Sequence, residues 1–404
     1  MKNKILFILT RPPYPAVDGT RERILGELKS LSTDFQIDLL IISNEELAEK
    51  AKTYLRDLSS GEIFYFKLPK IKSYLNCLAG LFSSRPLQSA YFYNKSALDW
   101  LTMNARKYQA LHFHTLRFGP YLKHLRTHEI YDNTDLLLCF NDAISLNYRD
   151  AQKKAKGLWK LIYSIETERV KNYELEMFKL ADRFSIVSER DKEYIQKNWQ
   201  EKYPNKETPS IQVIRHGIED ELFNYHYQPE TENLVFIGNL LYPPNRQGLL
   251  FFCGNILPGI IKAKPNSKLL IIGRGGKEFF SRRSNVEPLG FVDDPYLLMT
   301  KQAVFISPAD FGAGVPTKSL LAMALGLPVI STQNNAMGIE GILDGENICL
   351  IDYKEPKKAT KKIIELLDDE IQMKMIANAG NELVFNKYRQ SINYPALKNF
   401  IQEE

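Results

Sequence analysis

The loop at residues 307–318, with the sequence SPADFGAGVPTK, combines residue types that are suited to binding an anion. It follows an apolar run and leads into a predicted helix from Ser319 to Leu325, which Thr317 can cap. Lys318 then falls in the first helical turn, where a cation is disfavoured because the helix N-terminus is positive. An anion bound between the Lys318 ammonium group and the helix N-terminus would remove that conflict. The pattern therefore predicts an anion site at Thr317 and Lys318; the alternative is that Lys318 only faces solvent.

Other glycine-rich or polar loops follow further apolar runs in the second half of the chain. In an open parallel sheet, ligands bind just beyond the carboxyl ends of the strands, so these loops are candidates for the same site. They are Gly238-Asn239, the run Gly273-Arg274-Gly275-Gly276, and Gly290.

The first half of the chain has equivalent candidates. Gly19 opens a predicted helix after Asp18, and a glycine at a helix start lets backbone N–H groups approach a phosphate. The alternative is a proline-rich turn followed by an ordinary helix cap. His114 follows the fourth apolar run, and Asp142 follows the fifth. We expect these side chains at the edge of a first sheet.

Short apolar runs that alternate with amphipathic helices must position all of these loops. Alternation of this kind predicts parallel sheets with right-handed crossovers. The runs form two series, at 5–9, 37–42, 63–66, 111–113, 136–140 and 184–187, and at 234–237, 269–272, 304–306, 329–331 and 348–351.

Between the two series, residues 199–210 are rich in lysine, proline and polar residues and are typical of a linker. We therefore predict an α/β protein with one doubly wound domain at 1–208 and another at 209–387. The last helix, at about 388–404, is expected to pack back on the first domain.

The composition excludes several classes of protein. The chain has 404 residues, 44% of them hydrophobic and 25% charged, with a net charge of +5, which is too small to indicate nucleic-acid binding. The four cysteines lie far apart, which favours free thiols in a reducing compartment. No run approaches the roughly 18 apolar residues of a membrane span, and the N-terminus is better read as a strand than as a signal peptide. We expect a cytoplasmic protein that can rest on the inner face of the membrane.

Two stretches mix basic and apolar residues. They are Lys70–Phe82 (KIKSYLNCLAGLF) and Lys153–Tyr163 (KKAKGLWKLIY). Such segments favour peripheral contact with a membrane. The alternative is that they form helices that pack inward and leave only their lysines outside.

The sequence motifs give little support for metal binding or redox chemistry. His112 and His114 lie on one side of a predicted strand, but no further ligands stand at zinc spacing. The run Gly273–Gly276 lacks the third glycine and the downstream acid of a dinucleotide fingerprint. We expect neither a metal nor a cofactor.

Several motifs together resemble retaining glycosyltransferase family 4, and in particular the bacterial exopolysaccharide-type sugar transferases. One segment of this chain resembles the donor-site signature of that family. It reads Gly314…Lys318…Ala322-Met323-Ala324…Gly326…Pro328-Val329-Ile330, followed by Glu340-Gly341. Similar segments precede it in order, at 214–223, 236–245 and 290–294.

The resemblance implies the GT-B fold, in which two Rossmann-like domains face each other across a cleft. The nucleotide-diphosphate sugar would bind the second domain as a substrate, and a glycan or lipid-linked acceptor the first. The resemblance implies that Lys318 holds the diphosphate and that His114 lies near the transferred sugar. With Asp142, which follows the fifth apolar run and is expected to line the sugar and acceptor pocket, they make up the predicted catalytic residues. The predicted donor-binding set is Gly19, Gly238, Asn239, Arg274, Gly290, Phe291, Gly314, Thr317 and Lys318.

The chain also departs from the family pattern. Two family glutamates are replaced by Ala313 and Leu321, and Asn239 stands where many members have an arginine, while Arg246 could replace a family lysine. The leading hypothesis is a retaining glycosyltransferase of polysaccharide or cell-surface glycan biosynthesis. The alternatives are a non-catalytic GT-B protein that acts as a binding or partner subunit, and a GT-B epimerase or phosphorylase.

Overall fold

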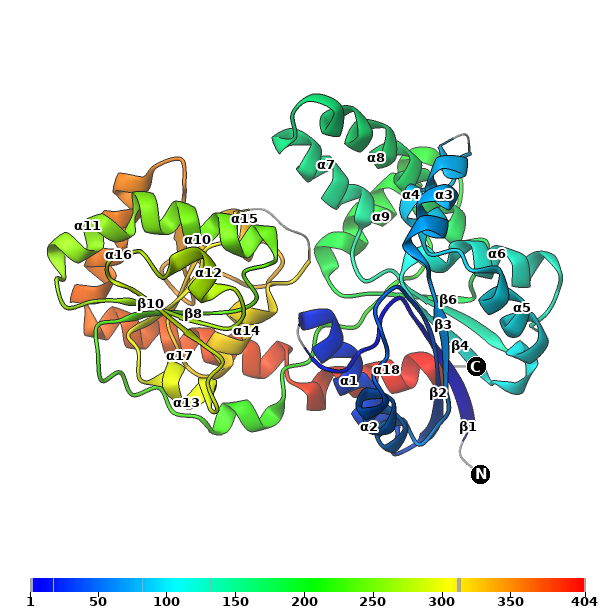
Figure 1. Cartoon of the computed structure of the whole chain (residues 1–404), viewed down its shortest axis with the longest axis horizontal. Helices are drawn as coiled ribbons and strands as arrows, with labels where there is room; N and C mark the ends of the chain where they lie inside the picture. The colour runs from blue at the N-terminus through cyan, green and yellow to red at the C-terminus, as the bar shows by residue number, and fades with distance from the viewer. Residues whose placement is uncertain (1–2, 17, 82, 132, 311–313, 403–404) are drawn as a thin grey trace. The chain divides into compact units, whose positions relative to one another are not determined.

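The chain folds into two compact units, as a computed structural model shows (Figure 1). The structure describes residues 3–16, 18–81, 83–131, 133–310 and 314–402. One unit comprises Met1–Arg215 with Tyr394–Glu404, and the other comprises His216–Asn393. Residues 199–210 belong to the first unit, and of these 199–202 lie in a helix, in which Trp199 is buried. The chain passes from the first unit to the second between Arg215 and His216, beyond this polar segment.

The first unit is built on a parallel sheet with the order β3-β2-β1-β4-β5-β6-β7. Along β1, alternate residues enter two different cores: Leu6 and Ile8 pack on one face, and Ile5, Phe7 and Leu9 on the other. Burial on both faces is why the strand is continuously apolar. The strands are β1 (Asn3–Leu9), β2 (Phe35–Ser43), β3 (Ile63–Lys67), β4 (Ala110–His114), β5 (Asp135–Cys139), β6 (Arg183–Ile186) and β7 (Gln212–Val213).

Helices cover both faces of this sheet. The final helix starts in the second unit and ends in the first, where Leu397, Phe400 and Ile401 join the core beneath β1 and β2. The helices are α1 (Gly19–Leu31), α2 (Glu49–Ser59), α3 (Lys70–Gly80), α4 (Leu87–Tyr91), α5 (Lys95–Asn104), α6 (Gly119–Thr127), α7 (Ile144–Lys154), α8 (Gly157–Met177), α9 (Glu189–Lys202) and α18 (Gln390–Gln402), with short 3₁₀ turns η1 (Ala105–Lys107) and η2 (Leu116–Phe118).

The second unit repeats the plan with a parallel sheet in the order β10-β9-β8-β11-β12-β13. Its strands are β8 (Leu234–Ile237), β9 (Leu269–Ile272), β10 (Val286–Gly290), β11 (Val304–Ser307), β12 (Val329–Thr332) and β13 (Cys349–Ile351). Its helices are η3 (Asp220–Asn224), α10 (Pro243–Asn255), α11 (Leu257–Ala263), α12 (Gly276–Phe280), α13 (Pro295–Thr300), α14 (Thr317–Ala324), α15 (Gln333–Ala336), α16 (Pro356–Asp368) and α17 (Glu370–Lys387).

Strand β10 is absent from the sequence prediction. Its residues include Pro288 and Gly290, which disfavour a central strand. The structure resolves the conflict because β10 lies at the edge of the sheet, where one side of the backbone needs no partner.

Each sheet has a switch point, where the order of strands reverses. In the first unit β1 lies between β2 and β4, and in the second unit β8 lies between β9 and β11. The loops that leave these strands diverge to opposite faces and open a crevice at the carboxyl edge. Among the candidate residues, Gly19 follows β1, Gly238 and Asn239 follow β8, and Gly314 follows β11. The other candidates lie at or after the carboxyl ends of neighbouring strands or at the start of α14. No helix among the described ranges is long and apolar enough to cross a membrane.

Candidate active site

Three loops of the second unit converge at the carboxyl ends of β8, β9 and β10. The N–H of Gly238 donates to Ile272 O at 2.9 Å, and the N–H of Gly273 donates to Gly290 O at 2.6 Å. A Cβ atom added to Gly273 would lie 2.5 Å from Gly238 O, so only glycine allows this approach. The predicted residues Gly238, Gly290 and the Gly273–Gly276 loop are therefore neighbours.

Lys318 reaches these loops from the start of α14. Its aliphatic stem lies against the backbone of Gly238, since a Cβ atom there would be 2.5 Å from Lys318 Cε. Gly238 has a φ of +155°, which side-chain-bearing residues rarely adopt. The structure thus brings together Gly238 and Lys318, two residues of the predicted donor-binding set that are 80 positions apart in the sequence.

The start of α14 differs from the prediction in one respect. Pro316 occupies the N-cap position, and its carbonyl accepts from the N–H of Ser319 and of Leu320 at 2.9 and 3.3 Å. Thr317 is therefore the first helical residue and does not cap the helix. No described side chain caps this N-terminus, so the positive helix end and Lys318 stand side by side.

A buried polar network fixes this helix start to the sheet. Ser319 Oγ donates to Ser307 Oγ at 2.9 Å, which ties α14 to the end of β11. The Asn335 side-chain amide donates to the same Ser307 Oγ at 2.8 Å and to Ser331 Oγ at 3.0 Å. Such locked partners keep a binding group in place before its ligand arrives.

The remaining donor-site candidates are either turn residues or exposed side chains. Asn239 accepts the N–H of Leu241 at 2.9 Å through its side chain, which makes it a turn residue. Arg274 is exposed, and Phe291 is 88% exposed beyond the end of β10. The guanidinium of Arg246 lies 4.9 Å from the ring centre of Phe279.

The structure describes one of the two positions at which the resemblance expects a glutamate, Leu321 but not Ala313. Leu321 packs against the core of the second unit on α14, so an apolar contact replaces the family carboxylate. Ala313 lies outside the described residues.

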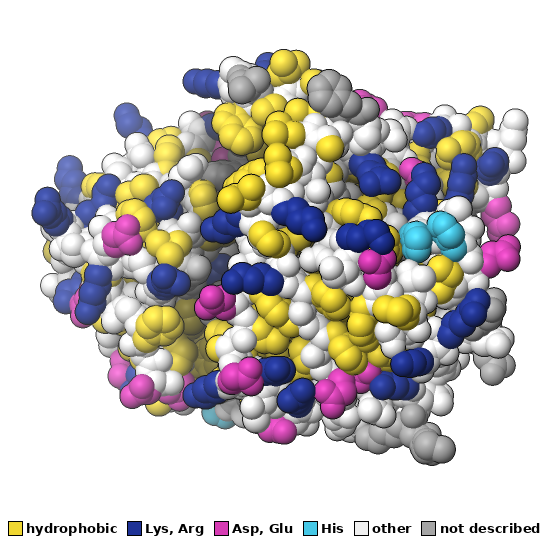
Figure 2. All heavy atoms as spheres, turned by 45° about the vertical axis from the view of Figure 1, so that its right-hand side comes forward, with side chains coloured by type: hydrophobic (Ala, Val, Ile, Leu, Met, Phe, Trp, Pro, Cys, Tyr) yellow, Lys and Arg dark blue, Asp and Glu magenta, His cyan; other side chains and the backbone are white. Residues whose placement is uncertain are grey.

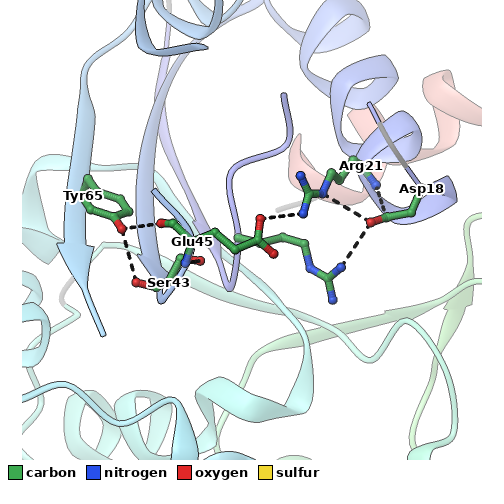
Figure 3. Close-up of polar contacts among 6 residues, drawn as sticks. Asp18, Arg21, Ser43, Glu45 and Tyr65 are labelled. Carbon is green, nitrogen blue, oxygen red and sulfur yellow. Dashed lines mark hydrogen bonds and ion pairs between the residues drawn. The ribbon is translucent and has the colours of Figure 1, made fainter. Parts of the chain in front are cut away.

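In the first unit, the loop from β1 to α1 is held by a chain of ion pairs (Figure 3). Asp18 caps α1 by accepting the Arg21 N–H at 3.1 Å, and its other oxygen lies 3.2 Å from Arg11 Nη1. Arg21 also pairs with Glu45, just after β2, at 2.6 Å. This network, which the sequence analysis did not identify, places Gly19 as the first residue of α1.

His114 lies beneath α1 and is only 4% exposed. Its Nε2 is 3.5 Å from Glu27 Oε2, and its ring packs against Phe7 and His112. Burial, together with His112 and Arg23, holds the pKa of His114 well below its usual value. The imidazole is therefore neutral at physiological pH and can exchange hydrogen bonds, but it cannot act as a cationic acid.

Arg23 joins α1 to the end of β5. It pairs with Glu27 at 2.6 Å and donates to Asn141 Oδ1 at 2.9 Å and to Cys139 Sγ at 3.3 Å. Asn141 has a φ of +62°. The Arg23–Glu27 pair thus connects α1, the helix that begins at Gly19, to His114 and to Asn141, the residue before Asp142. Sequence reasoning missed it, because Arg and Glu four residues apart on a helix usually form an exposed pair.

Asp142 belongs to a cluster of shielded carboxyl groups with Glu174 and Asp191. Burial and the nearby Asp191 raise the pKa of Asp142 to about 6, although Arg23 and Arg117 oppose the change. Burial raises the pKa of Glu174 to about 7 despite hydrogen bonds from the N–H and hydroxyl of Ser145. A carboxyl with a raised pKa at a strand end is suited to proton exchange with a ligand.

The raised pKa of Glu174 predicts a pH-dependent stability. A carboxyl that binds its proton more tightly in the folded state stabilises most below its ordinary pKa of 4.5, and this contribution is lost as the pH rises to about 7. Over that interval, Glu174→Gln should gain about 3 kcal/mol of stability relative to wild type. Urea unfolding at a series of pH values measures this, and a constant difference would contradict it.

Comparisons with known proteins extend this description. Residues 231–369 match the family model described as Glycosyl transferases group 1. An uncharacterized 44.6 kDa protein of the cps region of Klebsiella pneumoniae is 27% identical over 388 residues, which is 93% of each chain. The capsular polysaccharide biosynthesis glycosyltransferase CapM of Staphylococcus aureus is 29% identical over 149 residues, which cover 35% of this chain and 39% of that one. The crystal structure of Anabaena Alr3699/HepE in complex with UDP aligns over 100% of both chains with a TM-score of 0.69 and 13% identity.

These findings establish the class of fold: the two parallel-sheet units form a GT-B fold. The matching family model and the relatives further support a glycosyltransferase with that fold.

Proposed function

We propose that this protein transfers a sugar from a nucleotide-diphosphate sugar to a polysaccharide or glycolipid acceptor, with retention of anomeric configuration. The observation that carries the proposal is the position of Lys318. It lies against Gly238, where the glycine loops after β8, β9 and β10 converge beside the N-terminus of α14. This combination of backbone approach and positive charge suits a diphosphate. The UDP in the complex of Anabaena Alr3699/HepE, which has the same fold, supports a donor of this type.

The chemistry requires charge stabilisation at the leaving group. The bond between the anomeric carbon and the diphosphate oxygen breaks, the acceptor hydroxyl oxygen bonds that carbon on the same face, and the hydroxyl proton leaves. Lys318 and the helix N-terminus would stabilise the negative charge that develops on the departing diphosphate. We assign no metal, cofactor or covalent nucleophile to this reaction.

In the first unit, we assign His114 and Asp142 to the transferred sugar and the acceptor. His114 is held neutral, so it would position a hydroxyl group by hydrogen bonding. Asp142, with its pKa raised to about 6, could take up the acceptor proton near neutral pH. Two contacts of α1 support this assignment: Glu27 lies 3.5 Å from His114, and Arg23 donates to Asn141, the residue before Asp142.

We place the reaction in a reducing, cytoplasmic compartment, because all four cysteines are free thiols and three of them are buried. A second function is favoured by Leu321, which cannot hydrogen-bond a ribose. A chain without donor affinity would serve as a binding or partner subunit of another glycosyltransferase.

Nucleotide binding distinguishes the two functions. The protein would be heated with UDP, GDP, ADP, dTDP or CMP in turn. We expect one nucleoside diphosphate to raise the unfolding temperature selectively, since a ligand at one hundred times its Kd stabilises by about 2.7 kcal/mol. If none of the five stabilises the protein at millimolar concentration, the donor site is lost and the partner-subunit function stands. Once a donor is known, NMR of the first-formed product tests retention.

A further inference from the structure

Helix α3 of the first unit turns its large apolar side chains outward. Its buried residues are Ser73 and Gly80, whereas Ile71 is 78% exposed and Tyr74 is 62% exposed. A surface helix of a globular protein normally buries its apolar stripe and exposes its polar one. The sequence of Lys70–Phe82 leaves open whether this helix packs inward or faces a membrane. In the structure the large apolar residues of α3 do not pack inward.

The N-terminal part of α8 is inverted in the same way. Trp159 is 64% exposed and Leu161 and Ile165 are also exposed, while the polar residues Glu166 and Thr167 are buried. Two helices of the same unit, far apart in the sequence, therefore present apolar side chains to solvent.

Helix α8 contacts the segment at which α3 ends and α4 begins. Arg169 of α8 donates to the carbonyl of Leu81, the C-cap residue of α3, at 3.2 Å, and Glu166 of α8 accepts the backbone N–H of Leu87, the first residue of α4, at 2.8 Å. The α3–α8 patch is defined as Ile71, Tyr74, Leu75, Leu78, Leu81, Trp159, Leu161 and Ile165. In Figure 2, hydrophobic and basic side chains lie together at the top of the view, where Figure 1 has α3 and α8.

The charges around the patch are predominantly basic, although Glu168 of α8 is exposed three residues after Ile165. Residues 63–98 contain five basic residues and no aspartate or glutamate, and residues 151–165 contain four lysines and no acid. Lys70, Lys72, Lys156 and Lys160 are exposed. Of the 53 basic residues in the chain, nine lie in these two stretches, whereas none of the 48 acidic residues does, so this separation of charge is a local feature.

We propose that the α3–α8 patch binds the surface of a membrane that contains anionic lipid. The apolar side chains enter the boundary between headgroups and acyl chains, and the surrounding lysines meet the lipid phosphates. Trp159 is suited to this boundary because its ring is apolar and its N–H is polar. A second copy of the chain fits less well, since a two-fold interface would place lysines of equal charge against one another.

This surface lies on the first unit and is independent of the donor site on the second. A failure of nucleotide binding therefore leaves the membrane proposal untouched. The reverse also holds, because lipid binding can fail while a nucleoside diphosphate still stabilises the protein.

Vesicle flotation with the full-length protein tests the proposal. We expect wild type to float with vesicles that contain phosphatidylglycerol, to bind pure phosphatidylcholine vesicles far less, and to be released by high salt. Ile71→Ser and Trp159→Ser should each weaken binding about tenfold. Ile371→Ser on α17 is the matched control, because Ile371 is 74% exposed but has no such basic surroundings, and it should bind as wild type does.

Variants that each remove one lysine charge test the electrostatic part of the proposal. Lys72→Gln and Lys160→Gln should each lower binding about fivefold, whereas Lys50→Gln, an exposed lysine of α2, should not. Thermal unfolding checks that each variant remains folded. The proposal is overturned if wild type does not bind anionic vesicles, if the patch variants bind as well as the Ile371→Ser control, or if light scattering shows a dimer that the patch variants dissociate.

Discussion

Lys318→Ala is expected to leave the fold intact and to lower turnover with the nucleotide-sugar donor at least about tenfold. The physical reason is that its ammonium group offsets charge that appears on the diphosphate only as the sugar departs, so the loss falls on the transition state more than on binding. Steady-state kinetics with the donor identified by nucleotide binding measures this. Lys357→Ala, an exposed lysine on α16, is the matched control and should keep full activity.

Gly238→Ala should lower turnover as Lys318→Ala does, although the lysine itself is unchanged. The new methyl group would lie 2.5 Å from Lys318 Cε, and the flexible lysine stem can move away more easily than the backbone. The added strain at a φ of +155° should cost about 1 kcal/mol of stability. A Gly238→Ala enzyme that is folded and fully active would show that Lys318 need not lie where the structure places it.

The largest effect on stability is expected from Glu27→Leu, which leaves Arg23 buried without its carboxylate. Removing one partner of a buried ion pair costs about 3–5 kcal/mol, because the remaining charge loses both its partner and its water. Urea unfolding followed by tryptophan fluorescence is a suitable measurement. Trp100, Trp159 and Trp199 all belong to the first unit, so the signal reports its unfolding alone.

The double variant Arg23→Leu/Glu27→Leu separates loss of the pair from loss of packing. With no charge left in the core, it should be more stable than Glu27→Leu by about 1–3 kcal/mol. It should still lose activity, since Arg23 also holds Asn141 at the end of β5 and Glu27 lies against His114. Strictly additive losses from the two single variants would mean that the residues do not interact as a pair.

The architecture could be predicted because its signal is local. The run from Ile5 to Leu9 is apolar at every position, as expected for a strand buried on both faces, and its two sets of side chains do enter two cores. Parallel strands place their following loops at a common edge, so the position of Lys318 near Gly238 follows from chain order and topology.

Other features depend on surroundings that no sequence window contains. Arg23 and Glu27 have the spacing of an ordinary surface pair, and only packing beneath β4 and β5 makes them a buried connection to His114. Thr317 has the chemistry of a helix cap, but the carbonyl of Pro316 starts the helix one residue earlier.

The direction of α3 was likewise undecided by its sequence, because a basic and apolar helix can pack inward or face a lipid surface. The sequence by itself determined which strands form and which loops leave their ends, since burial on both faces of a sheet restricts residue type at every position. Only the tertiary structure decided which polar groups are buried and which apolar side chains are exposed, because those depend on neighbours that are distant along the chain.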